Sequence, residues 1–133
     1  MSMVFLDSCI VIYLVEKHPQ YFAGLVAQVQ KNAQARFVAS SLTALEVLVK
    51  PCKEQNDDLM ARYQMFLERF QVKGFDDSVL FKVVDFCVKG LKTPDAIHVA
   101  CAQQLQCDKF WTNDNRLSNL LPHWVVNVCE LND

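Results

Sequence analysis

Short apolar runs alternate with longer helical patterns along this chain, and that alternation limits the fold more than any other feature. The predicted strands cover residues 3–6, 36–39, 71–75, 109–112 and 124–128, and the predicted helices cover 8–16, 20–34, 41–51, 56–70, 77–88 and 94–106. Strands that alternate with helices form a mostly parallel sheet that is covered on both faces. No linker divides the pattern. We therefore predict an α/β fold, a three-layer sandwich, as a single domain over residues 1–133.

Local signals place several helix boundaries. Ser40 and Ser41 can cap the helix that follows them, and the helix is expected to end near Lys50 and Pro51. Thr93 is predicted as the cap of the helix at 94–106, whose first residue is a proline. Residues 56–70 form an amphipathic helix by the spacing of Leu59, Tyr63, Phe66, Leu67 and Phe70.

Composition restricts the class of protein. The chain has 133 residues, 52% of them hydrophobic, with 3 Gly and 4 Pro, which favours a folded globular body over a disordered one. The formal net charge of -2 does not exclude a nucleic-acid ligand, because Lys and Arg can gather on one side while acids cluster elsewhere.

The six cysteines predict neither disulfides nor a zinc site. They form no CxxC pair and mostly stand among Val, Phe, Ile and Ala, so we expect reduced, buried thiols. The strand-like run near residue 3 leaves no room for a leader segment, and the apolar run at 9–15 is too short to cross a bilayer. We expect a cytoplasmic protein with no membrane association.

Two aspartates follow predicted strands. Asp7 comes directly after the run at 3–6, and Asp114 follows the run at 109–112 after one intervening residue. Ligands of open parallel sheets bind beyond the carboxyl ends of the strands, so both are candidate site residues. A single aspartate at such a position is more often a turn or cap residue.

Two further acids lie in predicted helices. Glu46 is the only charged residue within 42–49, so its side chain must face either solvent or an interior site that neutralises it. Asp95 is the second residue of its predicted helix, where the helix dipole alone would favour a carboxylate.

Together the four acids offer the oxygen ligands that Mg²⁺ or Mn²⁺ requires. Such an ion activates water and neutralises charge on a scissile phosphate, as phosphodiester hydrolysis needs. The residues alone support an acidic site in an α/β fold.

Four motifs that carry these acids resemble, in order and spacing, the motifs of PIN-domain proteins. They are Leu6-Asp7-Ser8, Ser41-Leu42-Thr43-Ala44-Leu45-Glu46, Thr93-Pro94-Asp95-Ala96-Ile97-His98-Val99-Ala100 and Trp111-Thr112-Asn113-Asp114. The resemblance covers essentially the whole chain and is greatest to the toxins of VapBC toxin-antitoxin pairs.

That resemblance implies a cytoplasmic, metal-dependent endoribonuclease that a cognate antitoxin protein inhibits. It implies a PIN-like fold, a homodimer, a Mg²⁺ or Mn²⁺ cofactor and an RNA substrate, often a structured one such as tRNA. It also implies that the catalytic and metal-binding acids are Asp7, Glu46, Asp95 and Asp114.

Residues beside the acids add detail. Ser8 and Thr112 match small hydroxyl positions of the family, whereas Cys9 stands where many relatives have a polar residue. His98, one turn after Asp95, is a candidate to orient a ligand, although a buried and satisfied histidine is the commoner case. The basic residues that we expect to meet RNA phosphates are Lys50, Lys53, Lys92 and Arg116.

Two alternatives remain open. A catalytically silent PIN scaffold would bind RNA or a protein partner, but the presence of all four acids favours an enzyme. A phosphotransferase of the haloacid-dehalogenase kind would need a second aspartate two residues after Asp7, where this chain has Cys9.

The sequence shows no aromatic platform for RNA bases.

Overall fold

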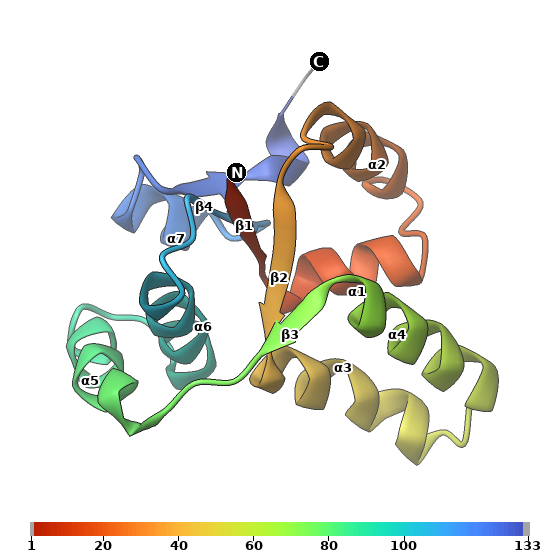
Figure 1. Cartoon of the computed structure of the whole chain (residues 1–133), viewed down its shortest axis with the longest axis horizontal. Coiled ribbons are helices and arrows are strands. Elements are labelled where there is room, and N and C mark those ends of the chain that lie inside the picture. Colours follow the sequence, from red (N-terminus) through yellow and green to blue (C-terminus); the bar gives the residue numbers. More distant parts are fainter. Residues whose placement is uncertain (1, 132–133) are drawn as a thin grey trace.

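The computed structural model describes residues 2–131 and contains a five-stranded sheet in the order β3-β2-β1-β4-β5. Each pair of neighbouring strands is parallel. The strands are β1 (Met3–Leu6), β2 (Arg36–Ser40), β3 (Gln71–Lys73), β4 (Lys109–Thr112) and β5 (Val125–Asn127). The predicted α/β sandwich around a parallel sheet is confirmed (Figure 1).

Seven α-helices connect and cover the strands within these residues. They are α1 (Ser8–Val15), α2 (Phe22–Lys31), α3 (Ser41–Lys53), α4 (Asp57–Arg69), α5 (Leu80–Val88), α6 (Thr93–Gln104) and α7 (Asn115–Leu120), with 3₁₀ turns η1 (Asp77–Val79) and η2 (Val128–Glu130). All six predicted helices are present. The seventh, α7, was not predicted, because six residues are too few for a helical period to show.

Alternate strand residues point to opposite faces of the sheet and form two separate cores. On one face Val4, Leu6 and Trp111 pack with buried residues of α1, α2, α3 and α4. On the other face Phe5 and Phe110 pack with residues of α5, α6 and α7. The inner strands β1, β2 and β4 are therefore buried on both sides, which explains why they are mostly apolar, whereas the edge strand β3 is exposed.

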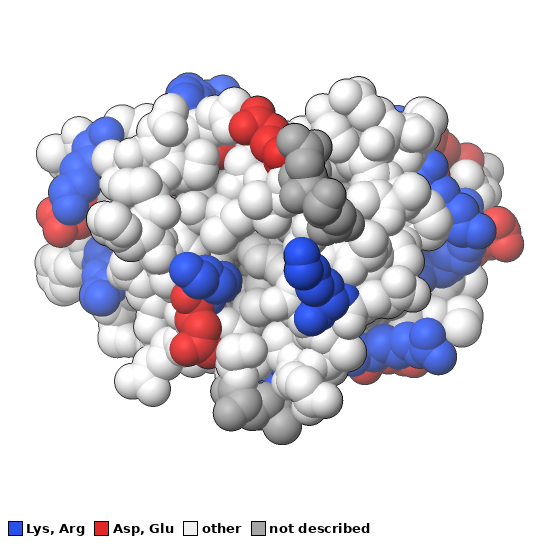
Figure 2. Space-filling model, turned by 90° about the horizontal axis from the view of Figure 1, so that it is seen from above, with Lys and Arg blue, Asp and Glu red and all other residues white. Residues whose placement is uncertain are grey.

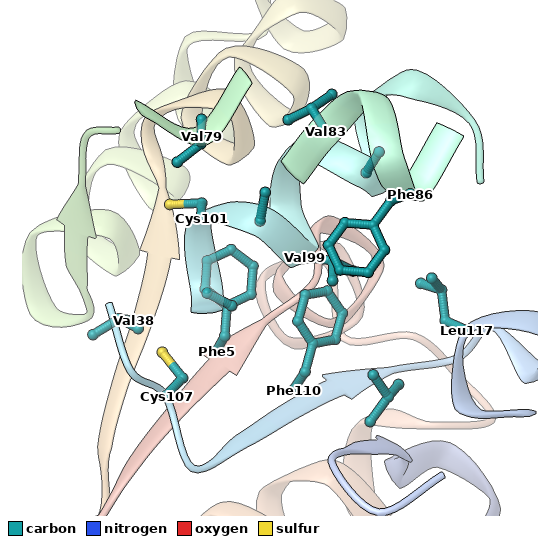
Figure 3. Packing of buried hydrophobic residues seen from close by; sticks show 14 residues of the cluster. Phe5, Val38, Val79, Val83, Phe86, Val99, Cys101, Cys107, Phe110 and Leu117 are labelled. Atoms are coloured by element: carbon teal, nitrogen blue, oxygen red, sulfur yellow. The ribbon is translucent and has the colours of Figure 1, made fainter. Parts of the chain in front are cut away.

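The core under α6 fixes the helix that carries Asp95 and His98. The rings of Phe5 and Phe110, on neighbouring strands, stack with centroids 5.0 Å apart, and Val99 of α6 lies against them (Figure 3). Each such fully buried side chain contributes about 2 kcal/mol through burial of apolar surface. This packing holds the polar face of α6 in a defined position above the sheet.

Several helix boundaries differ from those predicted: α2 is shorter at both ends, α5 begins only after the turn η1, and α6 ends at Gln104. Two further differences have a local cause. Helix α3 continues through Pro51 to Lys53, because the proline lies in the last turn, where its missing N–H costs only one helical hydrogen bond. Thr93 is the first residue of α6 and not its cap. Lys92 takes the cap position, and its carbonyl accepts a hydrogen bond from the N–H of Ala96 at 2.9 Å.

All six cysteines are free, as predicted. Cys101 and Cys107 are buried, whereas Cys52 is exposed, so the prediction of buried thiols is wrong for Cys52. Among the helices of residues 2–131, none is both long enough and apolar enough to span a bilayer.

Candidate active site

The centre of the sheet contains a topological switch point. From β1 the chain moves outward to β2 and β3 on one side, and β4 and β5 extend the sheet on the other side. In such sheets the crevice between the two diverging halves is the usual ligand site. Asp7 and Asp114 follow β1 and β4, the two strands that flank the switch point.

A cleft of about 410 Å³ opens at this edge of the sheet. Its walls combine residues of α1, α3, α6 and the loop after β4: Asp7, Ser8, Cys9, Tyr13, Glu46, Asp95, His98, Asn113, Asp114 and Asn115. The four acids predicted from sequence therefore converge in one cleft, although they lie far apart along the chain. Such convergence is what a shared cation site requires.

Asp7 is held firmly at the base of the cleft. Its side chain is only 8% exposed, and each carboxylate oxygen accepts one hydrogen bond, Oδ1 from the Ser8 amide and Oδ2 from the Thr112 hydroxyl, both at 2.8 Å. Burial raises the pKa of this carboxyl above its usual value, and the charge of Glu46 adds to the increase. Asp7 is both the cap of α1 and a buried member of the acidic site.

Asp95 faces the same cleft without a hydrogen-bond partner among residues 2–131. Its pKa is raised, first by burial and then by the negative charges of Asp7 and Asp114. The negative charges of Asp7 and Asp114 therefore disfavour ionisation of Asp95. A bound cation would reverse this effect.

Asp114 combines capping with a position in the site. Its Oδ1 accepts a hydrogen bond from the Arg116 amide at 2.9 Å, and the Arg116 Nε lies 3.8 Å from the same oxygen. The Asp114 amide in turn donates to the Thr112 hydroxyl at 3.1 Å. Because that hydroxyl donates to Asp7, Thr112 connects the two strand-end aspartates.

Glu46 is the one acid of the four that is held by a histidine. His98 Nε2 lies 2.6 Å from Glu46 Oε1, and the Ser8 hydroxyl donates to the same oxygen at 2.7 Å. These bonds lower the pKa of Glu46, the bond from His98 most strongly. Both contacts fall on Oε1, which leaves Oε2 of this 34% exposed, cleft-lining side chain without a described partner.

The second ring nitrogen of His98 is also occupied. The ring is 1% exposed, and Nδ1 lies 3.1 Å from the hydroxyl of Ser40, which caps α3 by accepting from the Thr43 amide at 3.2 Å. Since the Glu46 carboxylate can only accept, Nε2 must carry the proton that it donates. In the neutral ring Nδ1 then accepts from the Ser40 hydroxyl. His98 thus orients Glu46, the role that we weighed from sequence.

Charge elsewhere on the surface is mixed. The amino-terminal end of the sheet, opposite the cleft, carries Lys, Arg, Asp and Glu separated by neutral surface (Figure 2). The four basic residues expected to meet phosphates are exposed, and Arg116 lies beside a site acid.

The donor set suits a hard divalent cation. Carboxylate oxygens are the ligands that Mg²⁺ and Mn²⁺ prefer, and Glu46, Asp95 and Asp114 each present an oxygen free of described hydrogen bonds. Among residues 2–131, no three His, Cys, Asp or Glu side chains already stand in ligating positions. Metal binding would therefore require the carboxylates to draw together.

A parallel α/β sandwich with a carboxylate-lined cleft at its switch point defines the class of this protein. The sequence model of the PIN domain matches residues 4–120, and the chain therefore belongs to the PIN domain family. A search of curated protein sequences gave no match.

Solved structures share the same fold. A toxin-antitoxin complex from Klebsiella pneumoniae matches with a TM-score of 0.76 and 22% identity, covering 96% of this chain and 99% of that one. VapBC-1 from nontypeable Haemophilus influenzae matches with a TM-score of 0.74 and 18% identity, covering 96% of this chain and 99% of that one. VapBC2 from Rickettsia felis, bound to a promoter DNA fragment, matches with a TM-score of 0.73 and 18% identity, covering 93% of this chain and 97% of that one.

Two cleft features were missed in the sequence. Ser40 was expected as a helix cap, but its contact with His98 depends on the packing of α3 against α6. Tyr13 lines the cleft from α1, and the nearly uniform apolarity of that helix gives no sign of which face borders a site.

Proposed function

We propose that this protein is a metal-dependent endoribonuclease that acts as the toxin of a type II toxin-antitoxin pair. The observation that carries the proposal is the convergence of Asp7, Asp95 and Asp114 in one cleft, with burial and mutual repulsion raising the pKa of Asp95. Carboxylates that repel one another in an open cleft favour a site completed by a divalent cation.

Asp7, Glu46, Asp95 and Asp114 would hold Mg²⁺ or Mn²⁺. When bound, the ion would supply an activated water and neutralise charge on the scissile phosphate. Ser8 and Thr112 fix the Asp7 carboxylate through its two hydrogen bonds. His98 and Ser8 fix Oε1 of Glu46 and leave Oε2 available. We place the activity in the cytoplasm, where the free thiols would stay reduced.

A cognate antitoxin is the proposed protein partner, because the compared structures are toxin-antitoxin complexes. An apolar groove of about 390 Å³ offers a surface for it. The groove lies between α1, α2 and α4, and Arg62 and Arg69 stand beside apolar residues such as Phe22 and Phe66. This combination suits an amphipathic helix that carries acidic residues.

A second copy of the chain is the proposed partner of α5. That helix exposes four large apolar side chains: Leu80 (57%), Phe81 (86%), Val84 (59%) and Val88 (81%). Such a row on a monomer marks an interaction surface. A contact between two identical α5 patches closes as a two-fold dimer.

Expression of the protein without its antitoxin tests the biological part of the proposal. Induction should arrest growth, and Asp95→Asn should relieve the arrest at equal soluble yield. Asp57→Asn is the matched control, because Asp57 also lies in the first turn of a helix but outside the cleft. Equal arrest by wild type and Asp95→Asn would contradict an active-site origin of the toxicity.

A further inference from the structure

Tyr13 is the one Tyr, Phe or Trp among the described residues that line the cleft. Its side chain is half-buried, and its hydroxyl accepts a hydrogen bond from Asn113 Nδ2 at 3.1 Å. Asn113 directly precedes Asp114 in the loop after β4. The tyrosine is thereby tied to the same loop that carries one of the site acids.

Two more rings support Tyr13. The ring of His18 lies 4.7 Å from that of Tyr13 and 4.7 Å from that of Tyr21, with the His18 and Tyr21 planes 24° apart, and Tyr13 and Tyr21 lie 5.1 Å apart. His18 is fixed in turn, because its Nδ1 accepts from the amides of Gln20 at 3.1 Å and Tyr21 at 3.3 Å. The three rings form a preorganised cluster at the α1–α2 connection.

The need to pack the connection between α1 and α2 explains why His18 and Tyr21 lie where they do. It does not explain why Tyr13 borders the cleft. Neither His18 nor Tyr21 lines the cleft, whereas Tyr13 does, and its neighbours there are mostly carboxylates, hydroxyls and amides. A flat, partly apolar ring beside acids whose bound cation would contact a phosphate suits the adjoining nucleobase. Aromatic side chains stack bases of any identity, since every base has a π-face.

We propose that Tyr13 is a stacking platform for an unpaired nucleobase next to the scissile phosphate. The proposal rests on the proposed nuclease function and assigns one residue of its substrate-binding surface. Bases within a duplex already stack on one another, so only a base outside a duplex can lie on Tyr13. The bond from Asn113 and the contacts of His18 and Tyr21 hold the ring ready for it.

Equilibrium binding tests this proposal without cleavage. The probes are short adenosine, cytidine and uridine oligoribonucleotides, each with one 2-aminopurine, and a fully paired RNA duplex. The protein carries Asp95→Asn to prevent cleavage, and Mg²⁺ is present so that the remaining acids do not repel the phosphate. We expect Tyr13→Leu to weaken single-strand binding about tenfold and to abolish the quenching of 2-aminopurine that stacking causes. Tyr13→Phe, which keeps the ring, should stay within about twofold of the parent, and duplex affinity should not change.

Tyr21→Leu is the matched control, because it removes a ring of the same cluster that does not line the cleft. It should cost clearly less single-strand affinity than Tyr13→Leu and should leave the quenching of 2-aminopurine in place, because the ring of Tyr13 remains. The proposal is overturned if Tyr13→Leu has no effect, if single strands do not bind, or if duplex binding falls equally. It is also overturned if Tyr21→Leu causes the same loss as Tyr13→Leu. A separate cleavage assay with Asp95 intact tests the nuclease function, so the two can fail independently.

Discussion

His98 Nε2 lies 2.6 Å from Glu46 Oε1, and this contact joins α6 to α3 across 52 residues of sequence. The ring is buried and its other nitrogen meets Ser40 at the start of α3. The Glu46 side chain is long and 34% exposed, so packing alone would not fix its carboxylate. The buried ring of His98 orients it instead. If Glu46 is a metal ligand, His98 acts through it as a positioning residue.

Replacement of His98 should consequently weaken metal binding. We expect His98→Leu to reduce Mn²⁺ affinity about tenfold, a typical cost of losing a group that orients a metal ligand. His98→Gln, whose amide can donate near the position of Nε2, should retain most of the affinity. Titration of Mn²⁺ followed by electron paramagnetic resonance measures both.

A double-mutant cycle separates this role from a general loss of packing. In a Glu46→Gln background, His98→Leu should cause little further loss of Mn²⁺ affinity, because the residue that it orients is no longer a carboxylate. An equally large second loss would show that His98 does not act through Glu46.

Neutralisation of a cleft aspartate should stabilise the metal-free protein. Asp95 makes no described hydrogen bond and is repelled by Asp7 and Asp114, so Asp95→Asn should raise the free energy of unfolding by about 1 kcal/mol. The same substitution loses a favourable contact with the helix dipole, which removes about 0.5 kcal/mol of this electrostatic gain, so the net stabilisation is smaller. Thermal melts in chelator measure the net change. Asp57→Asn loses only a dipole contact and should not stabilise; stabilisation of both variants alike would contradict a shared acidic site.

The same repulsion sets the pH dependence of stability. The pKa values of Asp7 and Asp95 are raised in the folded state, so protonation of these carboxyls favours folding. Their contribution to the free energy of unfolding is full below the unfolded pKa of 3.8 and is lost as pH rises through the folded pKa values. We expect the gain from Asp95→Asn to be larger at neutral pH than at pH values near 3.8. Chemical denaturation of both proteins in chelator across this range measures the difference. A gain that is independent of pH would contradict the electrostatic cause.

The thiol at the cleft should be unreactive. Burial raises the pKa of Cys9 to about 12, and the charge of Asp7 contributes further, whereas Cys52 is exposed on α3. Because the thiolate is the reactive form, iodoacetamide at about pH 8 should modify Cys52 well before Cys9. Peptide mass spectrometry over time measures both. Equal rates would show that the Cys9 environment is open to solvent.

The sequence was sufficient for the fold because the sheet is buried on both faces. Such strands are continuous apolar runs, and β1 and β4 were predicted with the bounds that they have. The misplaced boundaries involve backbone hydrogen bonds, such as the one from Ala96 to Lys92, that local residue preference does not determine. Helix α7 was missed because its six residues show no period.

The site was predictable only in part. Asp7 and Asp114 follow strands, so their meeting at one edge follows from a parallel sheet. The contact of Glu46 with His98 and the position of Tyr13 depend on how helices pack over the sheet. Periodicity shows which face of a helix is apolar, but not which neighbour that face meets.

In the proposed function the cleft acids act together through a divalent cation to cleave RNA. The most direct test incubates purified protein with total cellular RNA in Mg²⁺ or Mn²⁺, with and without excess chelator. Wild type and Asp57→Asn should cut RNA in metal and not in chelator, whereas Asp7→Asn and Asp95→Asn should be inactive while remaining folded. Cleavage that persists in chelator, or that survives in both cleft variants, would contradict the account.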